Sequence, residues 1–289
     1  MAFKDILVHV DSSESGRTRS RLAVDLATRH GARLTALHVR EYSIAQQRRL
    51  KASELGLVPG NETDQLNRLI EGEIDANIND LQELLQQLEQ DRALDVQWVS
   101  IEGQAHKLVP QYSRYADLTI VGHDPSENAD LPDEYSFAET MIFTTGRPSL
   151  IVPTHAATAA NAQLGQHIAV AWNGSRASAR ALSDALPLIE QAERTSVLLV
   201  DPGPRGHPDS LPTVSILDHL ARHTANAHRQ PLQATDVCIG DMLQSAALSL
   251  GADLLVAGAH GRPGLWEKML GGVTRDLLAR MRLPLLMSY

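Results

Sequence analysis

Short apolar runs alternate with amphipathic segments along the whole chain. The apolar runs, such as "LLVAG" at 254–258, are continuous, which is typical of strands covered on both faces. In the first half we expect strands at 4–10, 33–39, 95–101, 117–122 and 148–152, and helices at 16–30, 62–91, 104–115 and 134–144. In the second half we expect strands at 166–172, 194–200, 232–238, 253–258 and 284–288, and helices at 175–192, 211–227, 240–250 and 272–281. This alternation predicts an α/β fold with parallel sheets and right-handed crossovers.

The same pattern occurs twice. "YADLTIVG", which ends at Gly122, resembles "GADLLVAG", which ends at Gly258, and the two stretches that begin near Lys4 and Gln166 are also alike. A repeat of half the chain predicts two tandem doubly wound, Rossmann-like domains, each with a five-stranded parallel sheet. We place the first domain at 1–154 and the second at 166–289. The small, uncharged residues 155–165 are typical of a linker.

Five glycines fall within 258–274, directly after a predicted strand and up to the start of the last helix. Ligands of open α/β sheets bind beyond the carboxyl ends of the strands, so this stretch emerges where a ligand is expected. Gly258 and Gly261 let the main chain bend and approach a ligand closely. Gly271 and Gly272 open the helix, whose free N–H groups favour an anion. Thr274 is a candidate cap or phosphate donor.

The spacing Gly258-x2-Gly261-x9-Gly271 resembles the nucleotide-binding signature of the universal stress protein family. The flanking stretches "DLLVAGAHG" and "GGVTRDLLARMRLPLLM" agree with it, and "ILVHVDSSESG" in the first half is similar to the opening strand and turn of the family. The resemblance therefore covers the chain as two tandem copies. It implies a stress-response protein with ATP, or ADP or AMP, with or without Mg, bound to the second copy. The candidate nucleotide-binding residues are Ala171, Asn173, Val200, Gly258, His260, Gly261, Arg262, Gly271, Gly272, Val273 and Thr274.

The chain departs from the family pattern at several positions. Gly272 stands where the family has Ser or Thr, which removes a hydroxyl donor to phosphate, and Asn173 stands where the family often has Asp. In the first half no glycine follows Gly122 at the required spacing, and the next residues include Asp124, Glu127, Asp130, Asp133 and Glu134. Because these charges repel phosphate, we predict that the first half does not bind ATP by this route. The resemblance also implies an intramolecular pseudo-dimer through the last strand of each half; a further homodimer stays open.

Composition narrows the classes of partner and compartment. The formal net charge of −9 argues against nonspecific binding to nucleic acid or to an acidic membrane surface. The single cysteine, Cys238, allows no internal disulfide and is interpreted as a small buried residue that ends a strand. The first residues have too short an apolar run for a signal peptide, and no run has the length of a membrane span. We expect a cytoplasmic protein.

Other candidate chemistry is weaker. His219 and His223 share a face of a predicted helix, which permits metal binding, but no third ligand is indicated and a solvated face is the better interpretation. No nucleophile or base can be assigned, so no catalytic residue is predicted. A sensor or regulatory role for a bound nucleotide fits best. Slow ATP hydrolysis in the second half and a nucleotide-independent, chaperone-like interaction module stay open.

Overall fold

The computed structural model describes residues 2–41, 61–123, 136–154, 163–200, 215–224, 226–233, 238–260 and 271–289, without the side chains of 61–74 and 200. The first half contains β1 Asp5–Val10, α1 Glu14–His30, β2 Arg33–Arg40, α3 Asn61–Arg92, β3 Val96–Glu102, α4 Ala105–Ser113, β4 Leu118–His123, α5 Phe137–Thr144 and β5 Ser149–Pro153. The second half contains β6 His167–Trp172, α6 Arg176–Ile189, β7 Arg194–Val200, α7 Ile216–Leu220, β8 Ala227–Leu232, α8 Ile239–Ser249, β9 Leu254–Gly258, α9 Gly272–Ala279 and β10 Leu285–Ser288.

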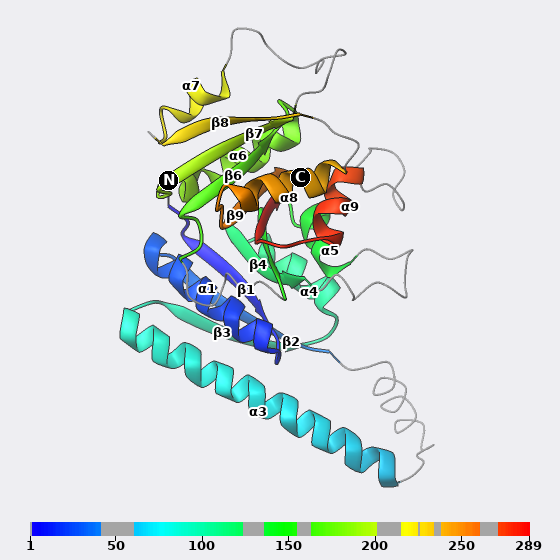
Figure 1. The fold of residues 1–289 in the computed structure, drawn as a ribbon. Helices are drawn as coiled ribbons and strands as arrows, with labels where there is room; N and C mark the ends of the chain where they lie inside the picture. Colours follow the sequence, from blue (N-terminus) through cyan, green and yellow to red (C-terminus); the bar gives the residue numbers. More distant parts are fainter. Residues whose placement is uncertain are drawn as a thin grey trace.

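The strands form one ten-stranded sheet with the order β3-β2-β1-β4-β5-β10-β9-β6-β7-β8 (Figure 1). Each half has the same strand order and is parallel throughout, as predicted. The halves join through their last strands, because β10 pairs with β5 in antiparallel register, with Leu286 opposite Leu150. The strands of the two halves therefore run in opposite directions, and their carboxyl edges lie at opposite edges of the sheet.

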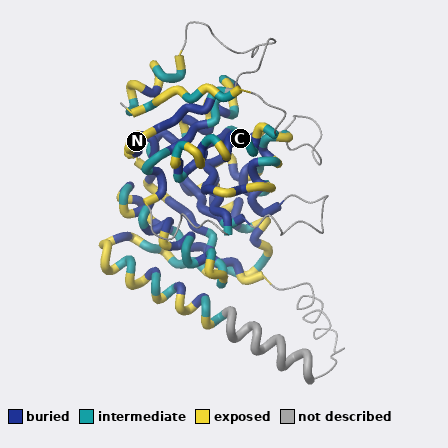
Figure 2. Tube along the Cα trace, viewed as in Figure 1, coloured by how far each residue is buried: buried dark blue, intermediate teal, exposed yellow. Residues whose placement is uncertain are grey.

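Helices cover both faces of the sheet, and each face has its own apolar core. Residues of the strands alternate between the two cores, so Ile6 and Val8 pack on one face while Leu7 packs on the other. The first core receives residues from α1, α3, α6 and α7, and the second from α4, α5, α8 and α9. Both cores draw on both halves of the chain, and the central strands are buried (Figure 2). This double cover explains the continuous apolar runs.

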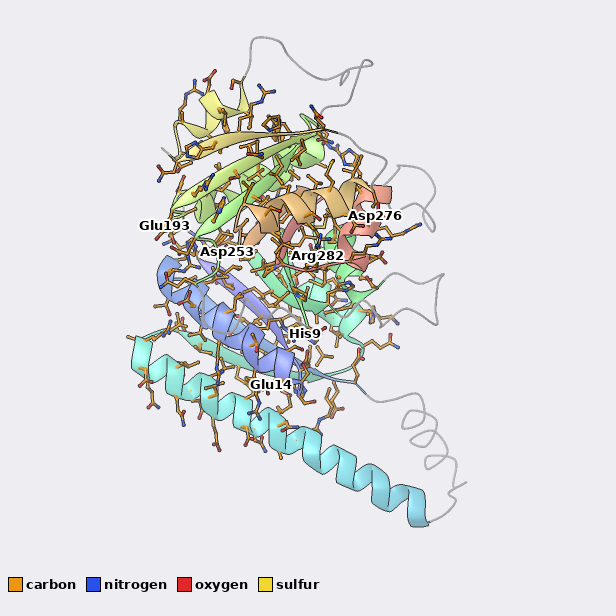
Figure 3. The ribbon with its side chains drawn as sticks, viewed as in Figure 1. His9, Glu14, Glu193, Asp253, Asp276 and Arg282 are labelled. Carbon is orange, nitrogen blue, oxygen red and sulfur yellow. The ribbon has the colours of Figure 1, made fainter. Side chains whose placement is uncertain are left out.

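The repeated Ala-Asp-Leu motif has a structural role in each half. In the first half, Asp117 accepts hydrogen bonds from the main-chain N–H groups of Lys4, at 2.8 Å, and Asp5, at 3.2 Å. In the second half, the counterpart Asp253 accepts three, from residues 165, 166 and 167, at 2.6, 2.8 and 3.0 Å (Figure 3). Each aspartate therefore fastens the start of the fourth strand of its half to the start of the first.

Asp253→Ala is expected to destabilise the chain by about 1–3 kcal/mol, because three main-chain donors lose their acceptor. Asp117→Ala is the matched control, since it removes only two such bonds, near exposed residues. The free energy of unfolding, measured by urea denaturation, should fall further for the change at 253. An equal or smaller loss there would contradict the role assigned to Asp253.

One predicted region of the second half is wrong. The helix expected at 211–227 is short where the structure describes it, since α7 covers Ile216–Leu220, and the strand expected at 232–238 lies instead at 227–232. Strand β8 is an edge strand with polar residues and Pro231, which edge strands tolerate because one side needs no ladder hydrogen bonds. Cys238 does not end a strand; it is half-buried and precedes α8 as its N-cap residue. The other predicted elements agree within three residues at either end.

Candidate functional site

The candidate site lies at the carboxyl edge of the second half, where β6 and β9 are neighbours and the strand order reverses. A tight turn leads from β6 into α6: Asn173 accepts a hydrogen bond from the main chain of Ser175 at 3.1 Å, and Ser175 caps the helix by accepting one from Ser178 N at 3.2 Å. A Cβ on Gly258 would run into the main chain of Ala177 and lie 2.5 Å from the nitrogen of Ser178. Gly258 therefore allows close helix–strand packing, and the close approach to a ligand expected from the sequence stays a prediction.

The chain leaves β9 and returns to the same place before α9 begins. Ala259 N donates to Ser288 O at 2.8 Å, and Gly271 N donates to His260 O at the same distance. His260 N donates to the hydroxyl of Thr274 at 3.3 Å. These bonds join the residues on either side of 261–270. Thr274 takes part in them and does not cap the helix, which was one of its two predicted roles. Gly261 and Arg262 lie outside the described residues.

Among the described residues, no side chain caps the amino end of α9. Its N-cap residue is Gly271, and its first turn contains no acidic residue. No atom of the described part of the chain lies within 4 Å of the position that a Cβ on Gly272 would take. Arg275, in the next turn, is exposed. Uncapped N–H groups and the positive end of the helix dipole together favour a negatively charged group here.

The carboxyl end of α9 is held by one buried side chain from each half. Gln244 of α8 donates to Leu277 O at 3.2 Å, and it accepts from the main chain of Arg282 at 2.8 Å (Figure 3). His123, the last residue of β4, contacts Leu278 O through Nε2 at 3.1 Å. Helix α9 is therefore fixed at its far end, which positions its amino end without a ligand.

The remaining predicted site residues lie near this edge. Ala171 is near the carboxyl end of β6 and half-buried, and Asn173 follows that strand and is exposed. Val200 is the last residue of β7. Val273 is partly buried against the core, and His260 is exposed. The structure thus brings together, at one edge, the described candidates from β6, β7, β9 and α9.

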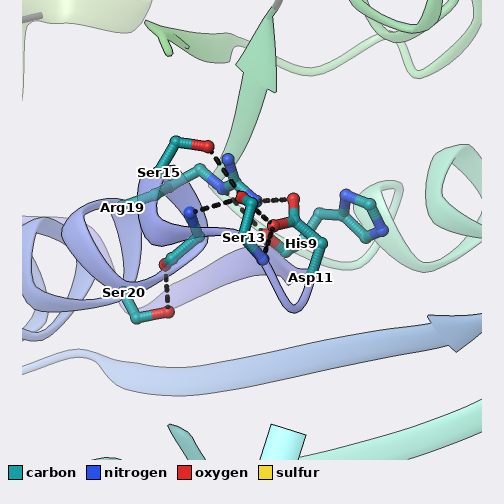
Figure 4. A network of polar contacts seen from close by, with 7 residues as sticks. His9, Asp11, Ser13, Ser15, Arg19 and Ser20 are labelled. Carbon is teal, nitrogen blue, oxygen red and sulfur yellow. Dashed lines mark hydrogen bonds and ion pairs between the residues drawn. The ribbon is translucent and has the colours of Figure 1, made fainter. Parts of the chain in front are cut away.

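The corresponding edge of the first half contains an ion pair between the buried Arg19 and the partly exposed Asp11, which the sequence analysis missed (Figure 4). Arg19 of α1 is 1% exposed; its Nη2 contacts the carboxylate of Asp11 at 2.5 Å, and its Nε donates to His9 O at 2.9 Å. Burial opposes the charge of Asp11, but Arg19 and Ser13 outweigh it and lower the pKa of this carboxyl to about 2. The spacing of Arg19 with Leu22, Ala23 and Leu26 was the available signal, because it places Arg19 on the apolar face of α1.

Two histidines with lowered pKa values, the half-buried His9 and the buried His30, make the stability of the fold depend on pH. Burial, followed by Arg19, lowers the pKa of His9 to about 3, and burial, followed by Arg29, lowers that of His30 to about 4. Both folded-state pKa values lie below the ordinary 6.5, so the unfolded chain takes up these protons first as the pH falls. Stability is therefore greatest above about pH 6.5 and declines toward pH 4.

We expect the free energy of unfolding to fall between pH 7 and pH 5, by up to about 1.4 kcal/mol per pH unit for each histidine. Burial raises the pKa of Asp253, which acts in the opposite direction, so the His9→Gln variant is needed to isolate one contribution. Urea denaturation at several pH values should give a flatter profile for that variant. An unchanged slope would contradict the assignment to His9.

The chain matches the family model of the universal stress protein family twice, over residues 2–129 and 165–288. The chain belongs to the universal stress protein family. Both copies have the strand order described above, so this is a tandem member whose two copies share one sheet. No curated protein matches the chain.

Solved structures agree on the fold. A universal stress protein from Archaeoglobus fulgidus DSM 4304 is 14% identical, with a TM-score of 0.64, and the match covers 98% of this chain and 97% of that one. A functionally unknown protein from Pseudomonas aeruginosa PAO1 is also 14% identical, with a TM-score of 0.60 and coverage of 99% and 92%. A protein from Pseudomonas aeruginosa UCBPP-PA14 is 16% identical, with a TM-score of 0.58 and coverage of 99% and 93%.

Within the residues described above, no helix has the length and apolar content needed to cross a membrane. Over the same residues, no group of three or more His, Cys, Asp or Glu side chains could hold a metal ion. His219 and His223 have ring centroids 5.1 Å apart, and His223 contacts Glu190 at 3.4 Å.

Proposed function

We propose that the second half, residues 166–289, binds an adenine nucleotide, with ATP as the first candidate, as a sensor or regulatory ligand. The observation that carries this proposal is the amino end of α9, which has no acidic residue in its first turn and, within the described residues, no side-chain cap and no atom within 4 Å of a Cβ at Gly272. An anion at such an end is stabilised by N–H donors and by the helix dipole, and a phosphate chain supplies that anion.

The other candidates take roles that their positions allow. The amide of Asn173 lies at the turn after β6, where it can hydrogen-bond ribose or base, and Ala171, near the end of that strand, supplies small apolar surface for the base. Val200 ends the neighbouring strand β7. His260 and Arg275 are exposed beside the phosphate end, and Arg262 follows in the same segment of the sequence. Mg, where it takes part, would arrive with the phosphates. The proposed role of the site is binding.

Mass spectrometry of the small molecules released from gently purified, denatured protein tests this proposal directly. We expect an adenine nucleotide at up to one equivalent per chain, and isothermal titration of emptied protein with ATP and Mg should show saturable binding. Titration with GTP is the control for the base. If no adenine nucleotide is released and millimolar ATP gives no saturable signal, the second half is not a nucleotide site.

A further inference from the structure

The two halves can be aligned residue by residue through a turn that they share. In the first half Ser13 caps α1 and donates its N–H to Asp11 at 3.0 Å; in the second half Ser175 caps α6 and donates in the same way to Asn173 at 3.1 Å. Counting six residues from each cap pairs Arg19 with Ala181. The fourth strands pair Gly122 with Gly258.

The paired positions differ in charge and size at the point where the strand order reverses. In the second half Ala181 is a buried methyl group and Asn173 carries no charge. In the first half the guanidinium of Arg19 is buried between Asp11 and His9 O. It also lies against β4, because a Cβ on Gly122 would run into its Nη1 and lie 3.1 Å from its Cζ. The edge between β1 and β4 therefore holds a side chain of the protein itself.

The first-half counterpart of α9 also differs from it in charge, at its amino end. Helix α5 begins with a capping box, in which Ser136 accepts from the N–H of Glu139 at 3.2 Å and the carboxylate of Glu139 accepts from Ser136 N at 2.8 Å. Counting from the two N-cap residues, Glu139 is the counterpart of Thr274. A carboxylate thus already lies at the helix end of the first half, whereas the helix end of the second half has none in its first turn.

We propose that Arg19 and Glu139 determine which half of the protein takes a nucleotide. In the first half, the guanidinium of Arg19 occupies the place that base or ribose would take, and the carboxylate of Glu139 occupies the place of the phosphate. Each chain therefore binds one nucleotide. This inference rests on the proposed function, because the second half defines the two places. The acidic residues at 124–134, which lie outside the described part of the chain, were expected to repel phosphate. The inference adds two specific side chains to that effect, and exchanging them should allow the first half to bind a nucleotide.

The test replaces the residues of the first half by their counterparts in the second, as Asp11→Asn, Arg19→Ala and Glu139→Thr together. Changing both members of the ion pair leaves no unpaired buried charge. Native mass spectrometry with ATP and Mg counts the nucleotides on each chain, and hydrogen exchange locates them. We expect one ATP on the wild type, and two on the variant, with new protection over residues 9–20. If the triple variant does not fold, the Asp11→Asn, Arg19→Ala variant tests the strand edge alone.

The outcomes separate this inference from the proposed function. Two nucleotides on the wild type, or one on both proteins, would overturn the role of Arg19 and Glu139. If the wild type binds none, the proposed function fails, and the variant then decides: one nucleotide in its first half supports the inference, and none overturns it.

Discussion

Gly258→Ala is expected to destabilise the chain by about 3 kcal/mol, at the upper end of what overpacking usually costs. The added Cβ would run into the main chain of Ala177 and lie 2.5 Å from the nitrogen of Ser178. These atoms belong to the first turn of α6, which Ser175 caps, so they cannot turn aside as the end of a flexible side chain can. Urea denaturation of the two proteins measures the difference.

Gly272→Ala is the matched control within the same glycine-rich stretch. A Cβ at 272 meets no atom of the described residues within 4 Å, and alanine is favoured over glycine in a helix by roughly 0.5–1 kcal/mol. This variant should be as stable as the wild type or slightly more stable. Equal losses at the two positions, or no loss at 258, would show that Gly258 does not hold α6 against β9.

The periodicity of the sequence predicted most of the fold because both faces of the sheet are covered. Central strands such as β4 and β9 are then continuous apolar runs, and the duplication gives each element a second example. Strand β8 was predicted at the wrong residues because it lacks such an apolar run. It lies at the edge of the sheet and is polar and partly exposed, so its sequence resembles a loop while the neighbouring apolar residues at 237–239 attract the strand prediction.

The candidate site was predicted as a stretch of sequence, but the roles of its residues depend on packing across the fold. Gly258 and Gly271 look equivalent to Gly272 in the sequence, yet the first faces the main chain of α6 and the second faces His260 O at 2.9 Å. At Gly272, no atom of the described residues lies within 4 Å of the Cβ position. Thr274 shares the buried face of α9 with Leu277 and Leu278, so its hydroxyl faces inward, toward His260 N.

Arg19 is another residue whose role depends on packing that the sequence does not show. It stands between Arg17 and Arg21 in "GRTRSRL", a basic stretch that resembles a solvated helix face. Arg17 does pair with Asp80 at the surface, at 3.2 Å, whereas Arg19 is buried against Asp11. The sequence spacing marks the buried face of α1, but the acceptors come from β1 and the turn after it, and only the folded chain shows that the guanidinium reaches them.

Gly272→Ser is expected to strengthen ATP binding about ten- to a hundredfold, if the nucleotide lies where we propose. The departure from the family pattern at this position removes a hydroxyl, and a hydrogen bond to a charged phosphate is worth roughly 1.5–3 kcal/mol. The described residues leave room for the hydroxyl, because none of their atoms lies within 4 Å of a Cβ at 272, and serine suits the first turn of a helix.

Titration calorimetry with ATP and Mg measures the dissociation constant for the wild type, Gly272→Ser and Gly272→Ala. The alanine variant has the same restriction of the main chain without the hydroxyl, so the ratio between serine and alanine isolates the hydrogen bond to phosphate. AMP offers fewer phosphate oxygens than ATP and should gain less from the serine if the hydroxyl meets the β- or γ-phosphate. A serine variant that binds ATP no more tightly than the alanine variant would place the phosphates away from the amino end of α9.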